Sequence, residues 1–274
     1  MRVVRTIAEM RSSLVKYPDI SLVPTMGNLH EGHLSLVRRA RERPGIVVAS
    51  VFVNPLQFAP HEDFATYPRT LERDFELLAG GDCDLVFAPS AREMYPEEQS
   101  VKVHPAKALG DMLEGAVRPG FLIGVCTVVL KLFNIVRPNT AVFGKKDYQQ
   151  LRVIQNMVRQ FSLPIEIIEA ETIRGADGLA LSSRNGYLSA SERNEAVQLP
   201  LVLRQVAGEV QSGHDNWAQV ERNAADVLRA RGWQPDYVAI RERSALRMPA
   251  AGQSLVVLGA ARLGTTRLID SLEI

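Results

Sequence analysis

The sequence lacks the features that mark several large classes of protein. It contains two cysteines, Cys83 and Cys126, among 274 residues, too few for a cysteine metal cage or a disulfide framework. No stretch approaches the roughly 18 consecutive apolar residues of a membrane-spanning helix. The first residues alternate apolar and charged side chains, unlike a secretory signal peptide. We therefore expect a cytoplasmic protein with no membrane partner.

Charge of one sign is not in excess either. The 32 lysines and arginines nearly balance the 31 aspartates and glutamates, which gives a formal net charge of +1. Such a chain has no broad positive field to hold a nucleic acid, so any phosphate must be recognised by a few placed groups. The length and the hydrophobic fraction of 46% indicate a globular protein with one large domain or two unequal ones.

Short runs rich in valine and isoleucine alternate with longer segments of helical period. This alternation is typical of parallel strands joined by helical crossovers, so it predicts the α/β class. Several runs are apolar at consecutive positions, as burial on both faces of a sheet requires. The predicted strands are 20–25, 45–53, 84–88, 140–144 and 165–170, and the predicted helices are 33–43, 70–78 and 147–161.

The composition changes after about Ile173. A stretch rich in glycine and serine leads to a long amphipathic segment and to further strands at 236–241 and 254–260. These features predict a second, smaller domain. Its helix is expected to start at Ser189 or Ser191, with Glu192 in the first turn, and to bend at Pro200.

Two histidines follow the first buried strand in the segment PTMGNLHEGH. His30 and His33 fall at the carboxyl end of a parallel strand and at the start of a helix, where open sheets bind ligands and backbone N–H groups favour an anion. Two imidazoles three residues apart lie on one helical face, which favours phosphate as the ligand. Gly32 between them leaves room for a nucleotide. A zinc site is the weaker interpretation, because no third ligand follows in the H-E-x-x-H manner.

Two later clusters also carry groups suited to phosphate. A strand-to-helix turn offers two ammonium groups, and a loop flanked by glycines offers hydroxyls and a guanidinium. The first cluster is Gly144, Lys145, Lys146 and Asp147, and the second is Ser182, Ser183, Arg184 and Asn185. Taken alone, the first equally suits a solvated charged turn, and the second equally suits a hydrophilic linker between domains.

Four segments occur in an order and spacing that resemble the pantoate–beta-alanine ligase family, also called the pantothenate synthetases. They are PTMGNLHEGH, FVNPLQF, KLFNIVRPNTAVFGKKDYQQL and DGLALSSRN, and the similarity spans nearly the whole chain. The resemblance implies an ATP-dependent ligase that joins (R)-pantoate to beta-alanine through a pantoyl adenylate and releases AMP and diphosphate. It also implies a homodimer.

The resemblance further implies a Rossmann-like parallel sheet of the nucleotidyltransferase and class I synthetase type at 1–175. A smaller C-terminal α+β domain at 176–274 is expected to act as a lid over the site, an interpretation that the glycine-flanked loop favours.

Roles for single residues come with the same resemblance. The residues expected to act in catalysis are His30, His33, Lys146, Ser182, Ser183 and Arg184. Those expected to bind ATP are Met26, Gly27, Asn28, Leu29, His30, Glu31, Gly32, His33, Gly144, Lys145, Lys146, Asp147, Ile173, Leu181, Ser182, Ser183 and Arg184. Those expected to bind pantoate, or to line the same region, are Asn54, Gln57, Arg118 and Gln150.

The reacting carboxylate of this chemistry belongs to the substrate, so the protein needs no serine or cysteine nucleophile. Its task is to position the substrates and to stabilise charge that develops on the phosphates, with Mg²⁺ as the metal partner. Asp74, in LERDF, is a candidate magnesium ligand, although its position equally suits an exposed acid on a helix.

One departure from the family pattern and two other functions stay open at this stage. Relatives commonly read R-P-G-H-F, whereas this chain has Phe121 after Arg118-Pro119-Gly120. Phe121 either alters substrate affinity or only packs the loop. The alternative functions are an H-x-G-H nucleotidyltransferase that acts on a phosphorylated acceptor, and a regulatory module that binds ATP without consuming it. The remaining histidines, expected to lie at the surface or in packing, are His61, His104 and His214.

Overall fold

The computed structural model describes residues 1–59, 62–250 and 252–274, so His61 lies outside the described residues. The contacts divide the chain into two compact units. The first comprises Met1–Gly144 and Val153–Ala170, and the second comprises Lys145–Arg152 and Glu171–Ile274. The domain boundary expected between residues 175 and 176 stays a prediction.

The first unit is built on a parallel sheet. Within the described residues it has six strands in the order β1-β4-β3-β2-β5-β6, and every neighbouring pair is parallel. The strands are β1 (Arg2–Val4), β2 (Ile20–Thr25), β3 (Ile46–Val51), β4 (Leu85–Phe87), β5 (Thr140–Gly144) and β6 (Glu166–Ala170). The predicted α/β class is therefore confirmed. The bounds of β2 and β5 match the sequence-based ones, and β1 was not predicted.

The strand order changes direction beside β2. The chain passes from β2 to β3 on one side of it, and later adds β5 on the other side. In a parallel sheet the two loops at such a switch point run in opposite directions. A crevice therefore opens between them at the carboxyl ends of the strands. The segment after β2, which contains His30 and His33, starts at this crevice.

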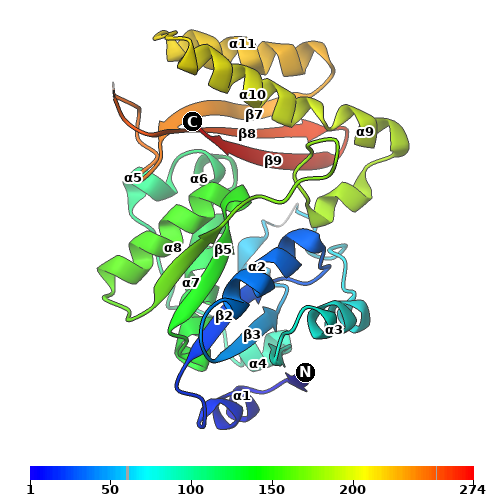
Figure 1. Ribbon diagram of the computed structural model, residues 1–274, viewed down its shortest axis with the longest axis vertical. Helices are drawn as coiled ribbons and strands as arrows, with labels where there is room; N and C mark the ends of the chain where they lie inside the picture. Colours follow the sequence, from blue (N-terminus) through cyan, green and yellow to red (C-terminus); the bar gives the residue numbers. More distant parts are fainter. Residues whose placement is uncertain (60–61, 251) are drawn as a thin grey trace. The chain divides into compact units, whose positions relative to one another are not determined.

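Helices of the first unit pack against the sheet through apolar stripes. Their bounds are α1 (Ile7–Leu14), α2 (Glu31–Arg41), α3 (Leu71–Gly80), α4 (Ala91–Met94), α5 (Lys107–Gly110), α6 (Glu114–Val117) and α7 (Phe121–Val136), with a short 3-10 helix η1 at Pro55–Gln57. Helix α2 lies beside β2 and β3 (Figure 1). Its Leu36, Val37 and Ala40 share one core cluster with Val23, Val47 and other strand residues. Helix α2 begins two residues earlier than predicted, and α3 ends two residues later.

Helix α7 was not predicted as a helix. Its sequence FLIGVCTVVLKLFNIV is apolar around most of its circumference, so it shows no clear amphipathic period, and such a helix is buried on most sides. Its interior includes Cys126, which is fully buried, and burial raises the pKa of that thiol to about 12. A thiol in this environment behaves as a small hydrophobic side chain.

The second unit combines an antiparallel sheet with helices. Its three described strands, β7 (Gln234–Glu242), β8 (Leu255–Leu263) and β9 (Thr266–Glu273), lie in sequence order. Helices α10 (Gln198–Gln211) and α11 (Trp217–Ala230) cover one face of this sheet (Figure 1), and Leu203, Leu228 and Ile240 are among the buried side chains between them. The predicted α+β character of the C-terminal part is confirmed. Strand β9 was not predicted.

Ser189 caps the first helix of this unit, as predicted, but the helix ends early. Helix α9 (Ala190–Glu195) starts with a capping box between Ser189 and Glu192. The helical conformation is interrupted between α9 and α10, so Pro200 lies in the first turn of a new helix. The prediction of one helix that bends at Pro200 is wrong, because a proline is well tolerated where its missing N–H has no partner to lose.

Helix α8 (Tyr148–Gln160) belongs partly to each unit, since its first turns lie in Lys145–Arg152 and the rest in Val153–Ala170. Two short 3-10 helices complete the second unit, η2 (Lys145–Asp147) and η3 (Ser183–Tyr187). Across the described ranges, no helix combines the length and the hydropathy that a membrane crossing would require.

Gly124 of α7 provides a test of the packing in the first unit. A Cβ at this position would lie 2.0 Å from the carbonyl oxygen of Leu56 in η1, and a backbone atom cannot move aside cheaply. We expect Gly124→Ala to lower the free energy of unfolding by at least about 1–3 kcal/mol, the usual cost of overpacking. Urea denaturation measures the change.

Gly80→Ala is the matched control, because nothing lies within 4 Å of the added Cβ at the end of α3. It should leave the urea midpoint unchanged or raise it slightly. Equal midpoints for the two variants would contradict the close approach of α7 and η1.

Candidate active site

The loop between β2 and α2 has an unusual backbone. Gly27 has φ +85° and Asn28 has φ +49°, so two consecutive residues adopt the left-handed conformation before the chain enters the helix. Thr25, at the end of β2, donates a hydrogen bond from its hydroxyl to the carbonyl oxygen of Ser50 in β3 at 2.7 Å. The loop therefore starts from a fixed point at the carboxyl edge of the sheet.

His30 and His33 cap the N-terminus of α2 reciprocally. His30 is the N-cap residue, and its Nδ1 accepts a hydrogen bond from the backbone N–H of Gly32 at 3.1 Å. Nδ1 of His33 accepts one from the backbone N–H of His30 at 3.3 Å. The two ring centroids lie 4.1 Å apart. The predicted pairing of the imidazoles is thus present, but His30 precedes the helix instead of lying on its face.

These hydrogen bonds assign the tautomer of both rings. A neutral imidazole carries one proton, and a ring nitrogen that accepts a hydrogen bond from a backbone N–H cannot carry it. The proton of His30 and of His33 therefore lies on Nε2. The site obtains two neutral N–H donors of defined direction.

Asp74 lies behind this loop, in the first turn of α3. Its side chain is fully buried, so the interpretation of an exposed helix acid is wrong. Oδ1 and Oδ2 accept hydrogen bonds from the backbone N–H groups of Leu29 and Asn28, respectively. Among residues 1–59, 62–250 and 252–274, no group of three or more histidine, cysteine, aspartate or glutamate side chains is arranged to hold a metal ion.

Asn54 and Gln57, predicted to line one region, are in direct contact. Nδ2 of Asn54 donates to Oε1 of Gln57 at 2.9 Å and to the carbonyl oxygen of Gly124 at 3.2 Å. Oδ1 of Asn54 accepts from the hydroxyl of Tyr95 at 2.8 Å. Nε2 of Gln57 lies 3.8 Å from Sδ of Met26, which connects this cluster to the β2–α2 loop.

Arg118 joins the same cluster but its charge is already balanced. Its Nε and Nη2 donate to the carboxylate of Glu62 at 2.6 and 2.9 Å, and Nη2 also donates to the carbonyl oxygen of Gln57 at 3.3 Å. The guanidinium lies 3.7 Å above the ring of Phe121. Phe121 therefore packs on the guanidinium and also lines one cavity of the first unit, so its two interpretations both stay predictions.

Two cavities of the first unit adjoin these residues. One of about 330 Å³ is lined by Gln57, Arg118, Phe121 and Gly124 among others. The other, of about 230 Å³, is lined by Met26, Gly27, Val51 and Asp74 among others. Both have mostly apolar walls with a few polar groups, which is the usual character of a small-molecule pocket.

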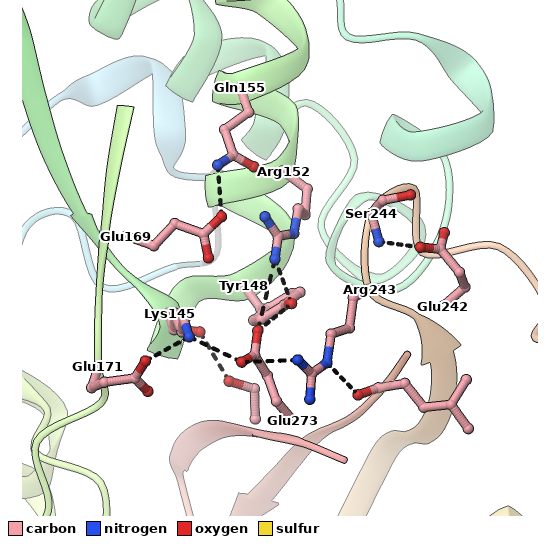
Figure 2. Close-up of polar contacts among 12 residues, drawn as sticks. Lys145, Tyr148, Arg152, Gln155, Glu169, Glu171, Glu242, Arg243, Ser244 and Glu273 are labelled. Carbon is pink, nitrogen blue, oxygen red and sulfur yellow. Dashed lines mark hydrogen bonds and ion pairs between the residues drawn. The ribbon is translucent and has the colours of Figure 1, made fainter. Parts of the chain in front are cut away.

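In the second unit, the two lysines of the predicted phosphate cluster differ in their partners. Nζ of Lys145 is bonded to the carboxylates of Glu171 and Glu273, the latter at 2.9 Å (Figure 2). The backbone oxygen of Lys145 accepts a hydrogen bond from the hydroxyl of Ser271. Burial alone lowers the pKa of Lys145, but the bonds to the two glutamates outweigh it and raise the pKa. Nζ of Lys146 has a looser ion pair with Asp147, at 3.7 Å. Lys146 is thus the better candidate for phosphate.

Glu273 of β9 is the centre of a polar network around this turn. Its carboxylate accepts from Nζ of Lys145 and from the hydroxyl of Tyr148 at 2.7 Å, and Arg243 lies 3.5 Å away (Figure 2). Burial raises the pKa of Tyr148 to about 12. Burial also works to raise the pKa of Glu273, but the bonds from Tyr148 and Lys145 are stronger and lower it. No local signal predicted Glu273, because it lies 128 residues from Lys145 in the sequence.

The serine-rich loop of the second unit is internally bonded. Ser182 caps η3, and its Oγ accepts from the backbone N–H of Arg184 at 3.3 Å. The backbone N–H of Leu181 donates to the oxygen of Ile173 at 2.9 Å, which brings together two residues predicted to bind ATP. Gln150 lies in the first turns of α8, close in sequence to Lys146. The roles of all these residues in binding stay predictions.

Comparison with known proteins identifies the chemistry that such a site serves. The model of the family described as pantoate-beta-alanine ligase matches residues 2–273. The pantothenate synthetases of Leptothrix cholodnii and Verminephrobacter eiseniae are 59% and 56% identical to the chain, with full coverage of both sequences in each case. The chain belongs to the pantoate–beta-alanine ligase family.

Solved structures of pantoate–beta-alanine ligases share the fold. The crystal structure of pantothenate synthetase from Thermus thermophilus matches with a TM-score of 0.93 and 47% identity, over 100% of this chain and 99% of that one. The Francisella tularensis ligase, crystallised with beta-gamma ATP and beta-alanine, matches with a TM-score of 0.82 and 32% identity, over 100% and 97% of the two chains. The resemblance read from the sequence is confirmed, and it favours a ligase over the two alternative functions.

The Glu273 network of this ligase predicts a pH-dependent contribution to stability. Because folding lowers the pKa of Glu273 from its ordinary value of 4.5, its stabilisation is fully present above that pH and is lost as the pH falls through the folded pKa. We expect Glu273→Gln to cost about 1–3 kcal/mol at neutral pH, as loss of a charged hydrogen-bond partner does. The difference from the parent protein should shrink below pH 4.5.

Urea denaturation at several pH values measures this difference. Asp226→Asn is the control, since Asp226 forms only an exposed i,i+3 ion pair with Arg229 in α11 among its described contacts, and such pairs contribute about 0–1 kcal/mol. A loss for Glu273→Gln that is the same at pH 3.5 and pH 7 would contradict the charged network.

Proposed function

We propose that this ligase activates (R)-pantoate with ATP as a pantoyl adenylate and then joins the pantoyl group to beta-alanine, with release of AMP and diphosphate. The single observation that carries the proposal is the reciprocally capped pair of His30 and His33 at the switch point of the sheet. It supplies two Nε2–H donors at the position where parallel sheets bind nucleotides. The ligand set of the Francisella ligase, beta-gamma ATP and beta-alanine, supports the choice of substrates.

In the first step the carboxylate of pantoate attacks the α-phosphorus of ATP. A new oxygen–phosphorus bond forms, the bond to the diphosphate breaks, and negative charge grows on the phosphate oxygens. Donors that are already in place stabilise this charge better than water, which has to reorient. We assign this role to His30, His33 and Lys146 with Arg184, and we assign hydrogen bonds from the hydroxyls to Ser182 and Ser183.

Pantoate is proposed to bind at the amide cluster of Asn54 and Gln57, with Gln150 as a further ligand. Amide groups suit a hydroxy acid because they donate and accept hydrogen bonds. Arg118 donates hydrogen bonds to Glu62 and to the backbone oxygen of Gln57. We therefore propose that Arg118 holds Gln57 in position.

In the second step the amine of beta-alanine attacks the acyl carbon, an amide forms, and AMP leaves with the bonding electrons. The attacking amine must be neutral and gives up its proton after attack. AMP is a good leaving group, so exclusion of water from the adenylate is the main requirement on the protein. We propose that residues 176–274 act as a lid that excludes water from the adenylate.

Mg²⁺ is proposed to enter as part of the substrate Mg·ATP. Mg²⁺ keeps several waters and binds through substrate phosphates with one or two carboxylates, so a dedicated protein cage is not needed. A homodimer in the cytoplasm is the assembly and compartment that we propose from the family.

The release of diphosphate from ATP tests the proposed function. We expect release that depends on pantoate and reaches one equivalent per active site without beta-alanine, followed by continuous turnover when beta-alanine is added. Release that requires beta-alanine from the first turnover would rule out a free-standing adenylation step.

Substitutions test the assigned donors. His33→Ala and Lys146→Ala should each lower the rate of pantoate-dependent exchange of diphosphate into ATP by about 10²- to 10³-fold, the usual effect of losing one preorganised donor. His214→Ala and Lys16→Ala remove the same side chains at exposed positions and should leave the rate unchanged. A near-parental rate in either test variant removes that residue from the catalytic set.

A further inference from the structure

Asp74 binds the backbone of the β2–α2 loop at two consecutive residues. Oδ1 lies 2.8 Å from the backbone nitrogen of Leu29, and Oδ2 lies 3.0 Å from that of Asn28. The hydroxyl of Thr70, the residue before α3, lies 3.2 Å from each oxygen. One carboxylate therefore receives two backbone donors of the loop and one side-chain donor of its own helix.

The backbone of the loop is shaped to receive this carboxylate. The chain turns through positive φ at Gly27 and Asn28, and the N–H groups of Asn28 and Leu29 both donate to this one carboxylate. A Cβ at Gly27 would lie 2.9 Å from Oδ2 of Asp74, so a side chain at that position would press on the carboxylate. A buried carboxylate is tolerated only when such donors replace its water.

The same contacts argue against Asp74 as a ligand of Mg²⁺. A carboxylate offers about four acceptor positions. Three donors, the N–H groups of Asn28 and Leu29 and the hydroxyl of Thr70, already occupy most of these positions on the fully buried side chain. A metal ion that replaced the backbone donors would break the bonds that fix the loop.

We infer that Asp74 is a positioning residue, which sets the direction of the two imidazole N–H donors by clamping the backbone of Asn28 and Leu29. His30 follows Leu29 directly, and its ring and that of His33 are bonded to the next backbone N–H groups. The carboxylate of Asp74 thereby fixes the backbone of Asn28 and Leu29. The backbone N–H groups that follow in turn fix the two imidazole rings. The catalytic part of this inference rests on the proposed function.

Asp74→Asn tests the inference with nearly unchanged shape. The asparagine amide keeps one acceptor oxygen but turns an NH₂ group toward a backbone N–H, so one clamp bond is lost. We expect hydrogen exchange at the amides of Asn28 and Leu29 to accelerate at least about tenfold. We also expect kcat for diphosphate exchange to fall about 10²-fold with little change in the KM for ATP, because a small misplacement acts mainly on the transition state.

Glu72→Gln is the matched control. Glu72 is an exposed acid in the same first turn of α3, and its substitution removes the same charge without touching the loop. It should change neither the exchange of the two amides nor kcat. A further series at rising Mg²⁺ separates the two roles of Asp74, since recovery of kcat at high Mg²⁺ in Asp74→Asn would show a metal ligand and overturn the inference.

Hydrogen exchange in the parent protein tests the clamp even where Asp74→Asn does not fold. Slow exchange of the Asn28 and Leu29 amides without ligand is expected, and exchange at the rate of an open loop would overturn the inference. Faster exchange in Asp74→Asn with an unchanged kcat would overturn the catalytic part. Failure of the parent protein to release diphosphate would instead count against the proposed function, because the exchange measurement does not depend on the reaction.

Discussion

The candidate active site of this ligase depends structurally on where the backbone N–H groups of one loop are directed. Those of Asn28 and Leu29 point at Asp74, and those of His30 and Gly32 point at imidazole nitrogens. These four N–H groups are therefore used within the protein. In many nucleotide-binding loops the backbone itself cradles the phosphates. Here the loop instead fixes two side chains, and we propose that their Nε2–H groups take the place of backbone donors.

The sheet supplies the scaffold for this arrangement through consecutive strands. β2 ends at the loop, β3 leads to η1 with Asn54 and Gln57, and the next helix, α3, carries Asp74. Parallel order brings the ends of β2 and β3 to one edge, so segments that are up to about 50 residues apart become neighbours. Gly124 of α7 then holds η1 from the other side, by direct backbone contact.

The sequence predicted those parts whose signal is local. β2 and β5 are short apolar runs buried on both faces, and the histidine pair is recognisable because it directly follows one of them. Helix α7 has too uniform an apolar surface to show a period. The partners of Asp74 and of Lys145 could not be predicted, because backbone donors carry no sequence identity and Glu273 lies 128 residues from the lysine that it binds. Long-range polar contacts of this kind need the fold before they can be seen.

The bond between Lys145 and Glu273 also has a consequence for biosynthesis. When the turn that carries Lys146 is synthesised, the strand that binds its neighbour Lys145 has not yet been translated, because Glu273 lies 128 residues after Lys145. The parallel sheet up to β6 can assemble before then, since its strands are all complete by Ala170. The turn proposed to bind phosphate therefore acquires its contacts with Glu273 and Ser271 only after strand β9 has been translated.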